Sequence, residues 1–197
     1  SKIIEPCMGT GSIIEELLKL NNCDENNTTL IGMEILPAPY ALSHYRISEL
    51  LKKELSEKKI NIYLTDTLSD DFDSDLGSDE NVFSEDKNDA KNICKKPIHV
   101  VIGNPPSTIV TNTHSPREKI NKLLDDFRPP KEHIKNRQNI QKALNNDSFR
   151  FLRWAVEKIS DSEHAIVSMI LPGSFSNSIS YKYARKWLLE KFDNIYV

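Results

Sequence analysis

The first twelve residues contain an apolar strand that runs directly into a glycine turn and a helix. The strand is centred on Ile3 and Ile4, the turn is Gly9–Gly11, and the helix is expected to begin at Ser12. Glycines separated by one residue let the chain turn sharply and bring bare backbone against a ligand, with the amides of the next helix pointing at it. The turn is therefore a candidate ligand site, and a tight strand-helix corner with no ligand is the alternative interpretation.

The helix after this turn carries a start signal and an apolar face. Ser12 followed three residues later by Glu15 is a capping-box pattern. Apolar side chains then recur at helical spacing at Ile13, Ile14, Leu17 and Leu18. The turn lacks the third glycine of a dinucleotide fingerprint and the Gly-Lys-Ser/Thr of a phosphate loop, which argues against NAD and ATP as its ligands.

A second turn, Gly103–Ser107, follows the apolar run Ile98–Ile102 and reads Gly-Asn-Pro-Pro-Ser. A near-continuous apolar run is typical of a strand covered on both faces in a parallel sheet. The two prolines fix their own φ angles and push Asn104 into an extended conformation, so its amide is held on a stiff support. The Asn104 side-chain carbonyl and the Pro105 backbone carbonyl offer two acceptors, which suit an amino group with two hydrogens.

Strand-like and helix-like segments alternate along the chain. Further strands are expected at Thr29–Met33, Ile60–Thr65, Ala165–Leu171 and Asn194–Val197. Three further helices are expected: one after Pro37 that packs through Ala38, Ala41, Leu42 and Tyr45, one capped by Asp147 that buries Phe149, Leu152, Val156 and Ile159, and one marked by Tyr181, Ala184 and Leu188. This alternation predicts an α/β fold with a doubly wound, mainly parallel sheet and helices on both faces.

The two turns resemble the motifs of a known enzyme family. Glu5–Ser12 resembles the cofactor motif, and Gly103–Pro106 the catalytic motif, of adenine-N6 DNA methyltransferases that use S-adenosylmethionine. Leu123–Pro130 and Asp147–Trp154 are similar to the methyltransferase part of single-chain restriction-modification enzymes, which join a helicase-nuclease to a modification domain. The resemblance covers nearly the whole chain and implies a Rossmann-like methyltransferase domain that acts on DNA.

The resemblance also implies roles for individual residues. It implies cofactor binding by Glu5, Pro6, Gly9, Gly11, Glu34, Asp66, Asn104 and Phe151, and catalysis by Asn104, Pro105, Pro106 and Ser107. Glu34 would accept bonds from the ribose hydroxyls, unless it is an ordinary acid at a helix start. Asp66 would contact the adenine amino group of the cofactor. Phe151 would pack on that adenine, with core packing as the alternative.

One position departs from the family pattern. The residue after Pro-Pro is usually an aromatic that stacks on the target adenine, which must be flipped out of the duplex, and here it is Ser107. Stacking is worth about 1–3 kcal/mol per base. Either another aromatic substitutes, with Phe175 and Tyr181 as candidates, or catalysis is impaired. Phe175 ends the segment Pro172–Phe175, which in the family lines the target-base pocket.

The amino-acid composition narrows the choice of binding partners and of cellular compartment. The chain has 197 residues, 26 Lys and Arg, 29 Asp and Glu and a net charge of -3, so no global basic signal for nucleic acid is present. A local group, Lys131, Lys135, Arg137 and Lys142, could contact DNA phosphates or could be a solvated surface. Three cysteines without a CxxC pair favour a reducing, cytoplasmic compartment and argue against a metal site. No run of the sequence suggests a membrane span or a signal peptide.

We predict one methyltransferase domain over residues 1–197, with a polar and mobile insertion at about 69–96. Asp, Ser, Asn and Glu dominate the insertion, and its few apolar residues cannot offset the entropy of ordering. Its aspartates suggest a calcium loop only in part, because Gly77 and Val82 do not match the required positions. Because the first strand begins almost at Ser1, we expect a fragment of a larger protein.

The predicted function is methyl transfer to adenine in DNA, within a restriction-modification or phage-defence system whose helicase, nuclease and target-recognition domains are fused or associated. Transfer to a protein glutamine or to adenine in RNA is an alternative, since the same two acceptors serve any planar amino group. An inactive cofactor-binding module that supports DNA recognition is another, favoured by Ser107 and the acidic balance. The methyltransferase hypotheses require the turns at Gly9–Gly11 and Asn104 to open onto one cleft.

Overall fold

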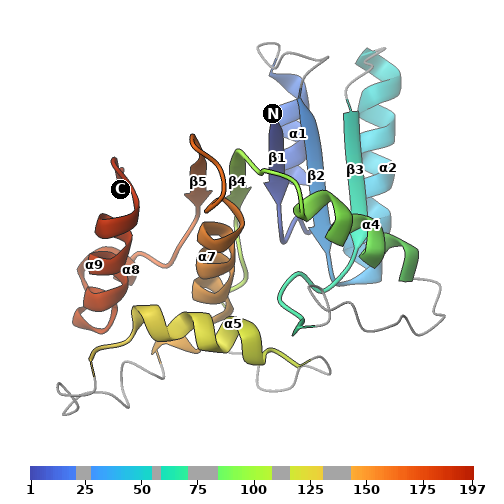
Figure 1. The fold of residues 1–197 in the computed structure, drawn as a ribbon. Coiled ribbons are helices and arrows are strands. Elements are labelled where there is room, and N and C mark those ends of the chain that lie inside the picture. The colour runs from blue at the N-terminus through green and yellow to red at the C-terminus, as the bar shows by residue number, and fades with distance from the viewer. Residues whose placement is uncertain (21–27, 55–58, 71–83, 108–115, 131–142) are drawn as a thin grey trace.

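The computed structural model describes residues 1–20, 28–54, 59–70, 84–107, 116–130 and 143–197. Its sheet contains β1 (Lys2–Glu5), β2 (Thr29–Glu34), β3 (Lys59–Leu64), β4 (Val100–Gly103) and β5 (Ile166–Met169). The strand order is β3-β2-β1-β4-β5, and the four neighbouring pairs are parallel. The predicted doubly wound α/β fold is therefore confirmed, and the carboxyl ends of these strands share one edge of the sheet (Figure 1).

Helices cover both faces of this sheet (Figure 1). One face carries α1 (Ser12–Lys19) and α2 (Pro37–Glu54), and the other carries α4 (Ser84–Cys94) and α7 (Asp147–Lys158). The remaining helical segments are α5 (Glu118–Leu123), η1 (Leu124–Phe127), α8 (Ser174–Asn177), η3 (Ile179–Tyr181) and α9 (Lys182–Lys191). Here η1 and η3 are short 3-10 helices.

The core follows from these layers. Ile14 and Leu18 of α1 are fully buried against Leu30 and Ile47, as the helical spacing predicts. On the other face, the sheet residues Ile4, Ile31 and Val101 pack in one cluster with Ala90 of α4 and Ala155 of α7. A second cluster on α7, η1, η3 and α9 buries the predicted residues Phe149, Leu152, Val156, Tyr181, Ala184 and Leu188. Ile159 is buried in the first cluster.

The predicted apolar face of α2 is wrong. Ala38, Ala41, Leu42 and Tyr45 are exposed. The helix instead buries Ser43 and Ile47, on a different face of the helix. The reason lies in the glycine turn, because a methyl group on Gly11 would lie 3.2 Å from both Ser43 Cβ and Ile47 Cδ1. Close packing against this turn selects a small side chain at Ser43 over the larger apolar stripe.

The expectation of an unpacked insertion is wrong for residues 84–94, which form α4. Ala90 of this helix is fully buried, and Ile93 and Cys94 pack against the core. Asp86 accepts hydrogen bonds from the Leu64 backbone amide and the Tyr40 hydroxyl, each at 2.9 Å. A few buried contacts and one bridging carboxylate are thus enough to dock a helix whose composition is polar. The aspartates weighed as a calcium loop lie outside the described residues.

Local signals at the predicted ends of elements also fail. The α1 N-cap is Gly11 with no side-chain cap bond, so the Ser12 capping box does not form. The α7 N-cap is Asn146, whose side chain accepts from the Ser148 amide, and Asp147 is already helical.

Two predicted strands also differ from the structure. Asn194–Val197 forms no strand. Strand β5 is not fully buried, because Ile166 and Ser168 on one of its faces are exposed.

Candidate active site

The two sequence motifs lie on neighbouring strands. β1 pairs with β4 in parallel register, with Ile3 opposite Val100 and Ile4 opposite Val101. At the ends of these strands, a methyl group on Gly103 would lie 3.5 Å from Cys7 Sγ and 3.6 Å from Pro6 Cδ. The turn after β1 and the turn after β4 therefore leave the same edge of the sheet side by side. The two turns are neighbours, as the predicted shared cleft requires, and the cleft itself remains a prediction.

Both glycines of the first turn have left-handed backbone, with φ of 56° at Gly9 and 82° at Gly11. A side chain is strained in this region, which explains the requirement for glycine. A methyl group on Gly9 would meet no described atom within 4 Å, so its backbone borders open space. Arg46 of α2 holds the turn by donating to Thr10 Oγ1 at 3.0 Å and by pairing with Glu15.

Glu5 lies beneath this turn and is 2% exposed. Its carboxylate accepts a hydrogen bond from the backbone amide of Ile14, the third residue of α1. Glu5 thus supplies the helix-capping acceptor that the sequence pattern assigns to Ser12. Burial raises the pKa of Glu5 to about 8; the Ile14 amide opposes this rise and the nearby Glu34 carboxylate adds to it. Glu5 Oε2 is buried with no hydrogen-bond partner among the described residues.

Glu34 at the end of β2 is also buried, at 7% exposure. Its Oε2 accepts from the Gly9 amide and its Oε1 from the Leu36 amide, each at 2.8 Å. Glu34 therefore holds the glycine turn in place. A carboxylate has about four lone-pair sites, so two amide bonds leave capacity for the ribose hydroxyls that the resemblance implies. That role remains a prediction.

Cys7 belongs to the first motif and packs against Gly103 of the second. Burial raises the pKa of its thiol well above the ordinary value, and the carboxylates of Glu5 and Glu34 raise it further. The thiolate is the reactive form of cysteine, so a raised pKa lowers the reactivity of Cys7. Its packing against Gly103 is the structural role of this residue.

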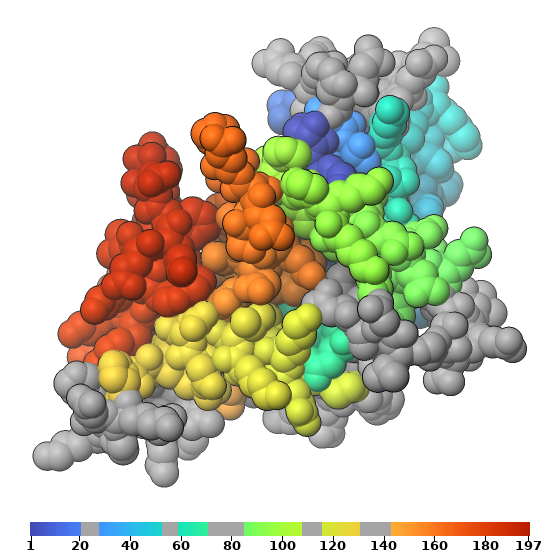
Figure 2. Space-filling model, in the orientation of Figure 1, coloured from blue at the N-terminus to red at the C-terminus, as the bar shows by residue number. Residues whose placement is uncertain are grey.

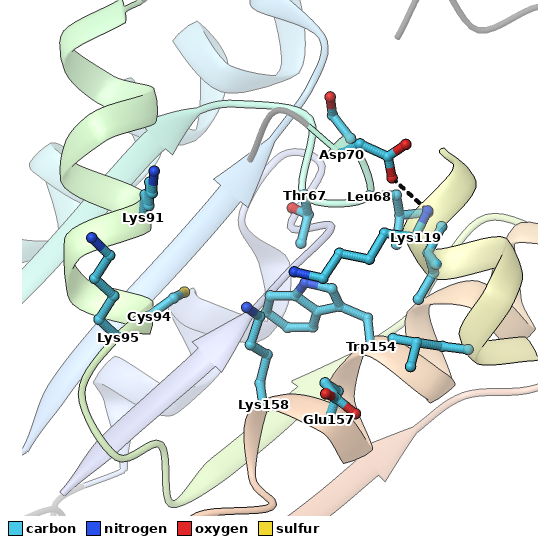
Figure 3. Close-up of a pocket in the computed structure, with 13 residues that line it drawn as sticks. Thr67, Leu68, Asp70, Lys91, Cys94, Lys95, Lys119, Trp154, Glu157 and Lys158 are labelled. Atoms are coloured by element: carbon cyan, nitrogen blue, oxygen red, sulfur yellow. Dashed lines mark hydrogen bonds between the residues drawn. The ribbon is translucent and has the colours of Figure 1, made fainter. Parts of the chain in front are cut away.

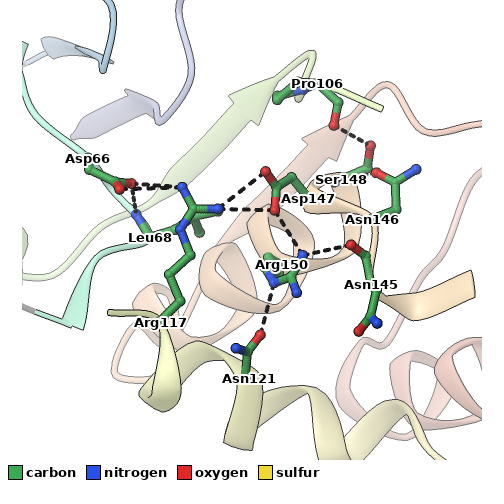
Figure 4. A network of polar contacts seen from close by, with 10 residues as sticks. All are labelled: Asp66, Leu68, Pro106, Arg117, Asn121, Asn145, Asn146, Asp147, Ser148 and Arg150. Carbon is green, nitrogen blue, oxygen red and sulfur yellow. Dashed lines mark hydrogen bonds and ion pairs between the residues drawn. The ribbon is translucent and has the colours of Figure 1, made fainter. Parts of the chain in front are cut away.

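The third predicted carboxylate, Asp66, is held by an arginine that the sequence analysis missed. Arg117 Nη2 lies 3.3 Å from Asp66 Oδ2, and Arg117 Nη1 donates to Asp147 Oδ1 at 3.1 Å (Figure 4). Asp147 also pairs with Arg150 at 2.9 Å. Arg117 and Asp66 are 10% and 14% exposed in their side chains, so this pairing is largely shielded from water. Arg117 therefore joins the end of β3 to the start of α7.

The same network reaches the Asn104 turn. Ser148, next to Asp147, donates from its hydroxyl to the Pro106 backbone carbonyl at 3.0 Å (Figure 4). Pro105 is buried, whereas Asn104, Pro106 and Ser107 are exposed. Pro105 thus anchors the turn, and the Asn104 side chain, for which the sequence predicts a stiff support, is exposed. The amide makes no hydrogen bond to the part of the chain that the structure describes, which leaves its oxygen available to accept.

The candidate aromatic residues fall into different places. Tyr181 is buried and stacks on Phe149 with ring centroids 4.5 Å apart, so it is not available to replace the aromatic missing at Ser107. Phe175 is partly buried and remains a candidate. Phe151 lies in the main core cluster, as the core-packing alternative states, and its contact with a cofactor remains a prediction. The basic group at Lys131–Lys142 lies outside the described residues.

Two arginines essential to this geometry, Arg46 and Arg117, carry no local signal in the sequence. Each pairs with acids that lie 30 or more positions away: Arg46 with Glu15, and Arg117 with Asp66 and Asp147. Only the fold brings these partners together. A basic residue among many others in a polar segment could not be singled out beforehand.

The family profile of the N-6 DNA methylases matches residues 1–195. The chain belongs to the N-6 DNA methylase family. Membership in this family implies a methyl-donor cofactor. No curated protein is significantly similar to the chain.

Within the described ranges, no group of three or more His, Cys, Asp or Glu side chains could hold a metal ion. None of the helices described here is long and apolar enough to span a membrane.

Solved structures show the same fold as this N-6 DNA methylase chain. They include the DrdV-DNA complex, at 24% identity and a TM-score of 0.74, and the ATP-dependent Type ISP restriction-modification enzyme LlaBIII bound to DNA, at 21% and 0.69. A type I methyltransferase subunit from Streptococcus thermophilus matches at 15% and 0.56. The matches cover 98%, 96% and 96% of this chain, but only 19%, 14% and 33% of the other chains.

Proposed function

We propose that this domain transfers a methyl group from S-adenosylmethionine to the exocyclic amino group of adenine in DNA, as the modification part of a restriction-modification system. The single observation that carries the proposal is the juxtaposition of the glycine turn after β1 and the Gly-Asn-Pro-Pro turn after β4. Methyl transfer is an in-line displacement, which requires the donor and the acceptor to be held about 3 Å apart and aligned. Two adjacent turns at one edge can hold them.

The residues around the glycine turn fit S-adenosylmethionine. The backbone of Gly9 borders open space, Glu34 has lone pairs to spare for ribose hydroxyls, and Glu5 has an unpartnered carboxyl oxygen close by. When bound, S-adenosylmethionine supplies an electrophilic methyl group attached to a sulfonium. Asp66 would accept from its adenine amino group, with Arg117 fixing the orientation of that carboxylate.

Asn104 would act on the target base. The adenine amino nitrogen is a poor nucleophile because its lone pair is delocalised into the ring. The Asn104 side-chain oxygen and the Pro105 carbonyl would accept both amino hydrogens, which favours the pyramidal nitrogen with a localised pair. This interaction is stronger in the transition state than in the ground state, so it accelerates the reaction. The target base must first leave the duplex, which costs a few kcal/mol.

Incubating the protein with labelled cofactor and, separately, DNA, RNA and protein tests the proposal. Label on adenine N6 of DNA is the expected result, and label only on protein would refute it. Asn104→Ala should lower the rate by at least about a hundredfold, because two hydrogen bonds to the transition state depend on this turn. Cofactor affinity, measured by calorimetry, should stay within about twofold. Undiminished turnover would remove Asn104 from the mechanism.

A second candidate function is an inactive cofactor-binding module, and the exposed Ser107 favours it. If stacking on the target base is what the site lacks, Ser107→Tyr should raise activity by about tenfold or more, since stacking is worth about 1–3 kcal/mol. Ser107→Leu adds apolar bulk without an aromatic face and is the matched control. An equal effect of both substitutions would argue against stacking. Binding of the cofactor without transfer in either variant would favour the inactive module.

A further inference from the structure

Glu5 is enclosed on both faces of the sheet. On one face α1 packs over β1, and its residue Ile14 is fully buried. On the other face, α4 and the segment that joins it to β4 leave little of β1 visible in Figure 2, where the strand is dark blue. Next to Glu5, the Pro6 carbonyl accepts a hydrogen bond from the Thr67 hydroxyl at 2.8 Å. Thr67 also borders a pocket of about 270 Å³ between α4, α5 and α7, which Glu5 does not line (Figure 3).

The carboxyl group of Glu5 has too few partners to be buried as an anion. It accepts one hydrogen bond, from the Ile14 backbone amide, whereas Oε2 has no partner among the described residues. An ionised carboxylate offers about four lone-pair sites, and burying it without donors or a paired cation costs so much that the group keeps its proton instead. Glu5 is therefore protonated in this arrangement, in agreement with a pKa that is raised to about 8.

No basic side chain of the described residues makes an ion pair with Glu5. Glu34 of β2 opposes its ionisation, and the thiol of Cys7 has a pKa raised by burial and by both acids. β4 carries no titratable side chain within Val100–Gly103. The charged groups of the other surrounding elements have partners of their own: Glu15 of α1 pairs with Arg46 of α2, Asp66 after β3 pairs with Arg117, Asp86 of α4 accepts from the Leu64 amide, and Lys2 of β1 donates to the Ile93 carbonyl. A cation that pairs with Glu5 would therefore come from a ligand.

The proposed cofactor supplies such a cation. The backbone of Gly9 borders open space, and its amide is bonded to Glu34 at 2.8 Å, so a ligand on the turn lies close to the two acids beneath it. S-adenosylmethionine carries a sulfonium and an amino group. An opposite charge within about 6 Å favours the ionised form of a carboxyl group. Binding of the cofactor should therefore favour loss of the Glu5 proton.

We propose that Glu5 releases its proton to solvent when the cofactor binds, and that the resulting carboxylate favours the sulfonium cofactor over its demethylated product. Methyl transfer leaves the bonding electron pair on sulfur, so the product, S-adenosylhomocysteine, has a neutral thioether. The product no longer offsets the charge of Glu5, which takes a proton back from solvent. Glu5 would thus determine specificity for cofactor over product, an inference that rests on the proposed methyl transfer.

Isothermal titration calorimetry with S-adenosylmethionine, in buffers of different ionisation enthalpy, measures the proton release directly. At pH 7, the natural protein should release about half a proton or more beyond Glu5→Gln, because Glu5 is mostly protonated before binding. The cofactor's own amino group also titrates near this pH, so the difference between the two proteins isolates Glu5. Glu190→Gln removes an exposed acid on α9 and is the matched control, which should release as many protons as the natural protein.

The pH dependence of affinity gives a second measurement. Between pH 6.5 and pH 8.5, the affinity of the natural protein for S-adenosylmethionine should rise about tenfold relative to that of Glu5→Gln, and should level off above about pH 8. The preference for S-adenosylmethionine over S-adenosylhomocysteine should rise about fivefold over the same interval in the natural protein. This comparison of two ligands needs no variant. Thermal unfolding checks that Glu5→Gln is folded at both values of pH.

The outcomes separate this inference from the proposed function. Equal proton release by the natural protein and Glu5→Gln would overturn the role of Glu5 and leave methyl transfer standing. So would a preference for cofactor over product that is the same at pH 6.5 and pH 8.5. Calorimetry requires no DNA, so Glu5-dependent proton release without any methyl transfer would support this inference while contradicting the proposed activity. Failure of S-adenosylmethionine to bind at either pH would overturn both.

Discussion

Two pairs of acidic side chains lie near the same edge of the sheet, and they have different kinds of partner. Glu5 and Glu34 are held by backbone amides, and no basic side chain pairs with either of them in the described ranges. Asp66 and Asp147 are bridged by the guanidinium of Arg117. The raised pKa of about 8 keeps Glu5 protonated near neutral pH, and neither acid of the first pair has a basic partner in the described ranges. The second pair is compensated by Arg117.

This difference in partners suggests a different role for each pair. An acidic pair without a basic partner can accept a positively charged ligand, and the proposed cofactor carries a sulfonium and an amino group. A compensated pair is suited to joining segments, and Arg117 joins the end of β3 to α7, whose Ser148 holds the Pro106 carbonyl. In the proposed function, the acids beneath the glycine turn would face the cofactor, and the Arg117 network would hold the Asn104 turn.

Removing the bridge should destabilise the protein at every pH. Arg117→Met leaves Asp66 and Asp147 largely buried without their shared cation, which should lower the free energy of unfolding by about 3 kcal/mol. Urea denaturation measures this loss. Lys186→Met is the matched control, since Lys186 and Glu190 are both exposed, and it should cost less than about 1 kcal/mol. Equal losses in the two variants would mean that the bridge does not hold the site together.

The pair of Glu5 and Glu34 predicts a dependence of stability on pH. The pKa of Glu5 is raised from 4.5 to about 8 in the folded protein, so the folded state keeps a proton that the unfolded chain releases. The resulting stabilisation is complete below about pH 4.5 and is lost as the pH rises to about 8, by at most about 1.4 kcal/mol per pH unit. Glu5→Gln is neutral at every pH, so it should gain stability over the natural protein as the pH rises.

Urea denaturation of both proteins at pH 5.5 and pH 8.5 checks this sign, and the gain should appear mainly at the higher pH. Asp66→Asn serves as the comparison from the compensated pair, because it removes a carboxylate that pairs with Arg117. It should destabilise the protein at both values of pH. A constant difference between Glu5→Gln and the natural protein across the range would show that Glu5 ionises normally.

The smallest effects concern the two helix starts at this edge. Asn146→Ala should cost about 1 kcal/mol, since its side chain accepts from the Ser148 amide. Ser12→Ala should cost less than about 0.5 kcal/mol, because α1 is capped through Glu5 and not through Ser12. The same denaturation assay compares them. A larger loss of unfolding free energy for Ser12→Ala than for Asn146→Ala would show that Ser12 does form the capping box that the sequence suggests.

The places where sequence-based expectation fails share one cause. The apolar residues of α2 form a plausible helical stripe, yet the helix turns a different face inward because Ser43 fits against Gly11. The polar composition of residues 84–94 suggests an unpacked segment, yet Asp86, Ala90 and a few neighbours dock it as a helix. In each case a contact with a distant segment outweighs a weak local preference.

From the sequence alone, the parallel α/β fold, the glycine turn and the stiff Asn104 corner could be inferred. These depend on short-range rules: strands covered on both faces are apolar, only glycine tolerates left-handed backbone, and proline fixes φ. The tertiary structure decided which acid caps α1 and which arginine holds Asp66. Charges act through space, so residues far apart in the chain acquire these roles only when folding brings them within a few ångströms of one another.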